Sequence, residues 1–151
     1  MSCSLFEDHA CEVILNDLVD KYSGQSKYGF EFERESCVRY VNKKRGRFDL
    51  VVKIIELRRF RICKTIHYEM KSCMGDLKSG RGINFHGDYN YLVYPRDSKP
   101  YVRNGASITS EKAKEWLKKH GYDRVGIICL REDDTLSVER EAFTMRAKSI
   151  V

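Results

Sequence analysis

The sequence lacks the patterns that mark several common classes of protein. Only two of its 151 residues are proline and no segment is of low complexity, which favours an ordered globule over a disordered chain. No apolar run approaches the ~20 residues that a membrane-spanning helix requires, so we expect a soluble protein. The six cysteines form no C-x-x-C pair and no leader with an apolar core precedes them, which predicts a reduced, cytoplasmic compartment and buried thiols.

Several catalytic signatures are also missing. The glycine-rich residues 75–87 contain neither G-x-x-x-x-G-K-[ST] nor a clean G-x-G-x-x-G after a strand, so they predict a surface loop and not a nucleotide-binding loop. The four histidines show no Ser/His/Asp or Cys–His arrangement for nucleophilic catalysis. A zinc site could be drawn from Cys63, His67, Cys73 and His86, but their spacing matches no standard zinc pattern.

Positive charge is in excess. Lys and Arg number 28 against 22 Asp and Glu, a formal net charge of +6, and the excess gathers in residues 42–47, 57–64 and 111–120. Such clusters fit a polyanionic partner such as DNA. Solvated faces and turns would give the same clusters, so charge supports a nucleic-acid partner without establishing one.

Hydrophobic periodicity divides the chain into helices and strands. Residues 5–22 repeat apolar side chains at helical spacing and predict an opening amphipathic helix. Three alternating stretches with short basic connections then predict an antiparallel meander. A strand, a helix capped by Thr109 or Ser110 and a second, parallel strand follow, giving an α/β fold. The predicted strands are residues 30–41, 47–57, 62–72, 89–95 and 124–130, and the second helix covers residues 109–121.

Three charged residues stand out within these predicted strands. Asp49 interrupts RFDLVV, a run suited to a central strand, where a carboxylate is costly unless a cation or several donors compensate it. Glu69 and Lys71 are two residues apart on the next strand, so they share one face. In a hairpin Asp49 and Glu69 can converge, and two hard carboxylate ligands suit Mg²⁺. Alternatively, Asp49 lies at a strand end and Glu69 and Lys71 form an ordinary surface ion pair.

The order of these residues and elements resembles the PD-(D/E)xK nuclease superfamily, which includes restriction endonucleases, junction resolvases and phage and repair nucleases. Asp49 matches its first acidic position and Glu69-Met70-Lys71 its E-x-K, and the resemblance covers residues 5–130. It is greatest to small single-domain branches, such as MmcB-like or phage-type proteins. One departure, Phe48 instead of proline before Asp49, is common in the superfamily. The resemblance implies a single restriction-endonuclease-like domain over residues 1–151, with a mixed central sheet flanked by helices in the order αβββαβαβ.

The resemblance also implies an activity, that of a metal-dependent DNA endonuclease. Asp49, Glu69 and the backbone carbonyl of Met70 would hold Mg²⁺, and Mn²⁺ would substitute for it. Lys71 would position or deprotonate the water that attacks the phosphodiester.

Many members of the superfamily add an acidic residue from the first helix or the first strand. Glu7 aligns with the core side of the predicted first helix, where a charge is unexpected. Glu35 of the first strand is a second candidate, with Glu33 as its competitor. Exposed glutamates without a role are the alternative for all three.

Basic residues around the predicted centre would contact the DNA phosphates. Asp76 would orient Lys71. Two other functions stay open, namely a catalytically inert DNA-binding accessory protein of the same fold and a phage-type protein-interaction module. A homodimer that cuts both strands is open as well, and no membrane partner is expected. The predicted nucleic-acid contacts are Lys43, Lys44, Arg45, Arg58, Arg59, Arg61, Lys78 and Arg81, with Asn84 and His86 beside them.

Overall fold

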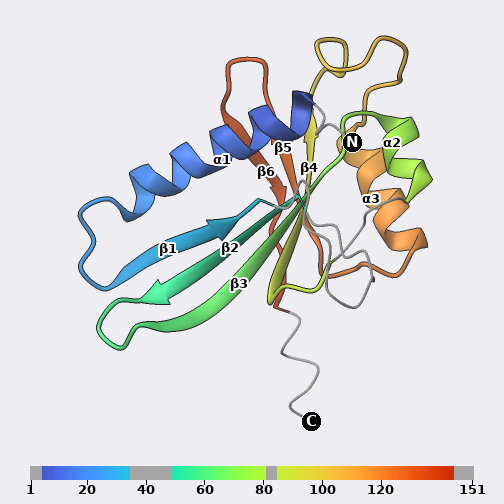
Figure 1. Ribbon diagram of the computed structural model, residues 1–151. Helices are drawn as coiled ribbons and strands as arrows, with labels where there is room; N and C mark the ends of the chain where they lie inside the picture. The colour runs from blue at the N-terminus through green and yellow to red at the C-terminus, as the bar shows by residue number, and fades with distance from the viewer. Residues whose placement is uncertain (1–4, 35–48, 81–84, 145–151) are drawn as a thin grey trace, which may run out of the picture.

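A six-stranded mixed sheet forms the middle layer of the computed structural model, which describes residues 5–34, 49–80 and 85–144 (Figure 1). In chain order the elements are α1 (Leu5–Tyr22), β1 (Tyr28–Glu33), β2 (Leu50–Glu56), β3 (Arg61–Met70), α2 (Met74–Ser79), β4 (Tyr89–Pro95), α3 (Ser110–Lys119), β5 (Gly126–Leu130) and β6 (Leu136–Arg140). The strands lie side by side in their order along the chain. β1, β2 and β3 are antiparallel, β4 and β5 run parallel to β3, and β6 returns antiparallel to β5.

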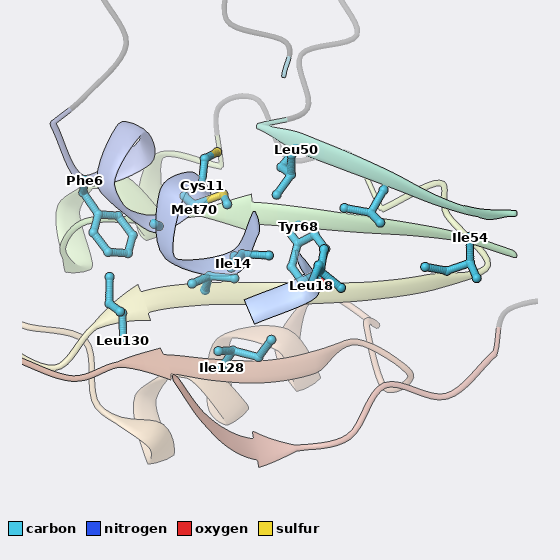
Figure 2. Packing of buried hydrophobic residues seen from close by; sticks show 13 residues of the cluster. Phe6, Cys11, Ile14, Leu18, Leu50, Ile54, Tyr68, Met70, Ile128 and Leu130 are labelled. Carbon is cyan, nitrogen blue, oxygen red and sulfur yellow. The ribbon is translucent and has the colours of Figure 1, made fainter. Parts of the chain in front are cut away.

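Helix α1 lies across one face of the sheet. Its buried residues Phe6, Ala10, Ile14 and Leu18 are four apart and so form one stripe along the helix, which Cys11 widens. Figure 2 shows this stripe packed over the strands. Each fully buried Phe, Leu or Ile side chain contributes about 1.5–3 kcal/mol by leaving water, so this contact fixes α1 on the sheet. The sheet residues of this core are Leu50, Val52, Ile54, Tyr68, Met70, Val93, Ile128 and Leu130.

Helices α2 and α3 cover the opposite face and make a second core (Figure 1). Leu77 of α2 and Ala113 and Leu117 of α3 are fully buried there against Leu92 and Ile127 of the sheet. Since neighbouring residues of a strand point to opposite faces, β4 and β5 contribute to both cores, whereas the core residues of β2 and β3 all lie under α1. None of the helices within the described residues is long and apolar enough to cross a membrane.

Most predicted elements are present, and their ends differ by a few residues. The first helix and the strand 89–95 have the predicted bounds, and the three-stranded meander and the parallel pair β4–β5 are confirmed. Thr109 is the N-cap of α3, because its side chain accepts a hydrogen bond from the N–H of Lys112 at 3.2 Å. The predicted first strand, residues 30–41, is β1 at Tyr28–Glu33, and residues 35–41 lie outside the described part.

Two elements were not predicted from residue patterns. The predicted loop over residues 75–87 begins instead with helix α2, whose six residues end at Gly80 with φ of 64°. So short a helix is unstable by itself, and it is held by the burial of Leu77. Strand β6 has five residues of mixed exposure, and no residue pattern predicts it.

Candidate functional site

Asp49 lies at the entrance of β2, and its side chain reaches the adjacent strand. Its Oδ2 accepts a hydrogen bond from the backbone N–H of Met70 at 2.6 Å, and only 8% of the residue is exposed. Continuing the β2–β3 register, in which Leu50 pairs with Tyr68, places Asp49 opposite Glu69. The first acidic residue therefore lies beside the Glu-x-Lys segment, as expected for a hairpin.

Glu69 is more deeply buried than Asp49. It lies near the end of β3 between β2 and β4, where it pairs with Leu92, and 1% of it is exposed. Its neighbours Tyr68 and Met70 belong to the core under α1, so Glu69 points to the other face of the sheet, toward α2 and α3. An ionised carboxylate in such a place requires charged or polar partners.

Lys71 follows β3 directly and extends the same row. Its backbone N–H donates to the carbonyl of Val93 at 2.9 Å, and 5% of the residue is exposed. Its Nζ lies 3.7 Å from Oδ1 of Asp76 in the first turn of α2. The other oxygen of Asp76 accepts a hydrogen bond from the N–H of Ser72 at 3.1 Å. The expected contact between Asp76 and Lys71 is thus present, and α2 supplies it.

His67 continues this row inward, although its spacing in the sequence suggests no role except in the zinc site that matches no standard pattern. It is 7% exposed, two residues before Glu69 on the same face, and it pairs with Asn90 of β4. Asn90 is fully buried and closes the turn at Gly87 with two hydrogen bonds of 2.9 and 3.1 Å. A Cβ at Gly87 would lie 2.8 Å from Cδ2 of His67, so the ring packs directly on this glycine. The alternation His67–Glu69–Lys71 in the sequence was the available signal.

The buried thiol of Cys11 connects α1 with the entrance of β2. Cys11 Sγ lies 3.9 Å from the carbonyl oxygen of Asp49 and donates to it. Burial raises the pKa of the thiol from 9.0 to about 12. Arg34 opposes this shift and lowers the pKa, whereas Asp49 and Glu7 add smaller increases. Glu7 lies half-buried in the first turn of α1, and its place in the acidic site stays a prediction.

The two glutamates of the first strand have different outcomes. Glu33 ends β1 with 63% of its side chain exposed and lies 3.5 Å from Nζ of Lys53, the geometry of a surface ion pair. Glu33 thus has the features of an exposed glutamate that has no role in the site. Glu35 lies outside the described residues.

The arginines at the turn between β2 and β3 are distant from Asp49 and Glu69. Arg58 and Arg59 lie in the turn between β2 and β3, and Arg61 begins β3, at the opposite end of these strands from Asp49 and Glu69. The seven residues of β2 separate the two ends by roughly 20–25 Å at ~3.3 Å per residue. Arg59 and Arg61 also lie 3.7 and 3.8 Å from Glu56. Any DNA that contacts both regions must therefore extend along the hairpin.

Of the other predicted phosphate contacts, the structure describes only Lys78 and His86. Lys78 is exposed on α2, two residues after Asp76, and His86 is exposed before β4. Lys78 also lines a groove of about 570 Å³ between α2 and α3. The remaining candidates lie outside the described residues: Lys43, Lys44, Arg45, Arg81 and Asn84.

A second groove, of about 770 Å³, lies between α1 and the strands that α1 leaves uncovered. Tyr68 and Tyr91 stack in its wall with ring centroids 5.7 Å apart, and Val138 is 49% exposed there. None of Asp49, Glu69 and Lys71 lines either groove. Acidic residues predominate around this second groove: Glu12, Asp17, Asp20, Asp134 and Glu141.

The donor set at Asp49 and Glu69 fits a hard divalent cation. Both carboxylates are buried, on facing positions of adjacent strands. Met70, whose carbonyl is the third donor, lies between Glu69 and Lys71 in the sequence. Carboxylate and carbonyl oxygens are the ligands of Mg²⁺, which needs only one or two carboxylates because it retains water. Among the described residues, no group of three or more His, Cys, Asp or Glu side chains is placed to hold a metal. A magnesium site here would accordingly rest on two carboxylates and backbone oxygen, unless Glu35 or Glu7 completes it.

Comparisons with known proteins found no match: no family model, no curated protein and no solved structure matches this chain.

Proposed function

We propose that the protein is a metal-dependent DNA endonuclease with a restriction-endonuclease-like fold of the PD-(D/E)xK type. One observation carries the proposal: Asp49, Glu69 and Lys71 are all buried at the same end of the β2–β3 pair, on the face away from α1. An ordinary surface ion pair would leave these side chains in water. The order of the first eight elements also agrees with the αβββαβαβ order that the resemblance implies.

In this proposal Asp49 and Glu69, with the carbonyl of Met70, hold Mg²⁺ or Mn²⁺. When bound, the ion would activate a water and offset the negative charge of the scissile phosphate. The hydrogen bond from Met70 to Asp49 fixes the carboxylate before any ion binds, which lowers the cost of assembling the site. The low exposure of both carboxylates strengthens their electrostatic attraction for a cation.

Lys71 supplies the positive charge of the site. Its ammonium would donate hydrogen bonds to the attacking water and to the phosphoryl oxygens as they gain charge. Asp76 acts as a positioning residue, because its carboxylate holds Nζ of Lys71 from α2 while accepting the N–H of Ser72. The four free cysteines of the described residues, three of them buried, fit the reducing cytoplasm that we propose as its location.

The direct test is cleavage of DNA by the purified protein. Plasmid, linear duplex, single-stranded, flap and junction DNA are incubated with Mg²⁺ or Mn²⁺, and EDTA is added to a parallel series. We expect EDTA-sensitive nicking or cutting that Asp49→Asn, Glu69→Gln and Lys71→Met each abolish. If the protein binds DNA but cleaves none of these substrates with either metal, the result would refute the nuclease and favour an inert accessory protein.

A second candidate function, a protein-interaction module, is favoured by the groove between α1 and the sheet. Its wall is apolar and aromatic while its rim is acidic on a protein of net charge +6, a combination that would repel DNA and attract a basic amphipathic segment. Tyr91→Ala, in the wall of this groove, would weaken such binding, whereas Asp49→Asn would not change it.

A further inference from the structure

The groove between α2 and α3 presents positive charge on both of its walls. Lys78 lies on α2, and Lys112 and Lys119 lie on α3, against a single acidic side chain, Glu115. We propose that this groove binds the phosphates of one nucleic-acid strand and so extends the catalytic centre. The inference rests on the proposed nuclease function, and it adds to that function the path that the strand takes across the protein.

The spacing of the lysines suits a linear polyanion. Lys112 and Lys119 are seven residues apart, so they lie on the same side of α3 about 10 Å apart along its axis. Lys78 faces them across the groove, and all three side chains are exposed. Cations distributed along both walls can follow successive phosphates of a strand, whereas a small anion would use only one of them.

The floor of the groove is apolar and firmly supported. Met74, Ala106 and Trp116 line it, and the N–H of Met74 donates to the carbonyl of Ala106 at 2.9 Å. Trp116 lies with its ring 4.1 Å from the ring of His120 and 6.0 Å from that of Tyr122, measured between centroids. A basic groove with an aromatic floor is the usual surface for a single strand, since the cations bind phosphate and the apolar floor contacts sugar and base.

The short helix α2 connects the groove with the proposed catalytic lysine. Its Asp76 contacts Lys71, and its Lys78 lines the groove about 200° further around the helix axis, so less than one turn of helix separates the two. A strand whose scissile phosphate lies at Lys71 could therefore continue past α2 without crossing the acidic groove beneath α1. The arginines at the tip of the β2–β3 hairpin lie at the far end of the strands, so the groove places phosphate-binding charge much closer to the centre.

The test compares two triple variants that remove the same charge. Lys78→Gln, Lys112→Gln and Lys119→Gln together empty the groove of lysine. The control replaces three exposed lysines that do not line it, Lys99, Lys114 and Lys118, two of them on the same helix α3. Fluorescence anisotropy with a labelled single-stranded oligonucleotide is measured in EDTA at several NaCl concentrations, and melting temperatures verify that both variants are folded.

We expect the groove variant to bind the oligonucleotide more weakly and to flatten the slope of log K against log[salt] by about 2. This value corresponds to about 0.7 for each of three phosphate contacts to a single strand. The control variant should keep the slope of the wild type. Equal losses in the two variants, or a wild-type slope in the groove variant, would overturn the proposal, and the second result is the one expected if an acidic protein segment occupies the groove instead.

Because the binding assay contains EDTA, it does not depend on hydrolysis. Groove-dependent binding by a protein that cleaves no DNA would refute the nuclease and retain the groove. Metal-dependent cleavage with unchanged binding by the groove variant would refute the groove and retain the nuclease.

Discussion

Replacing Asp49 with Asn distinguishes a metal-binding carboxylate from one that only stabilises a strand end. In the absence of metal the substitution has two opposing effects. The hydrogen bond from Met70 changes from a charged to a neutral acceptor, a loss of about 1 kcal/mol. Removing one of two facing buried carboxylates relieves repulsion and offsets that loss. We therefore expect the melting temperature of apo Asp49→Asn to lie within about 4 °C of the wild type.

Added Mg²⁺ should then separate the two proteins. A ligand at ten times its dissociation constant stabilises the native state by RT ln 11, about 1.4 kcal/mol. For a domain of this size that is an increase in melting temperature of roughly 3–6 °C. The wild type should show this increase in millimolar Mg²⁺ and lose it in EDTA, and Asp49→Asn should show little or none.

Asp88→Asn provides a matched control. The carboxylate of Asp88 also accepts a backbone N–H of β3, that of Thr65 at 2.9 Å, but in the middle of the strand, five residues before Met70. It should therefore retain the full Mg²⁺ response. Differential scanning fluorimetry of the three proteins with and without metal gives the result, and identical responses in wild type and Asp49→Asn would refute the metal site.

Two further predictions concern neighbours of the site. Asp76→Asn should leave KM nearly unchanged and slow cleavage about tenfold, a barrier increase of ~1.4 kcal/mol, because Nζ of Lys71 loses the carboxylate 3.7 Å away that positions it; a change in KM alone would contradict this role. Cys11 affects stability at alkaline pH, since burial raises its pKa from 9.0 to about 12. Below pH 9 the thiol is protonated in both states, whereas above it the unfolded chain ionises first and stability falls. Between pH 8 and 10.5 the wild type should therefore lose about 2 kcal/mol more than Cys11→Ala in urea unfolding, and equal losses would show that the thiol does not contribute.

The sequence determined the features that depend on neighbouring residues. The period of the apolar side chains was sufficient to place α1, because a helix repeats its core side every three or four residues. The two-residue alternation of a strand was sufficient to put Glu69 and Lys71 on one face, opposite Tyr68 and Met70. The capping role of Thr109 was local in the same sense.

Tertiary structure decided the features that depend on residues distant in the chain. The burial of Glu69 follows from its place between β2 and β4, and the contact of Asp49 with Met70 follows from the register of the hairpin, neither of which a local pattern fixes. Helix α2 is too short to form by itself and exists because Leu77 is buried against the sheet. Tertiary structure also separates the two basic regions. Arg58, Arg59 and Arg61 lie at the start of β3, whereas Lys78 lies on α2, beyond the end of β3 that carries Glu69. The direction of each strand, and not its composition, determines which charges lie near one another.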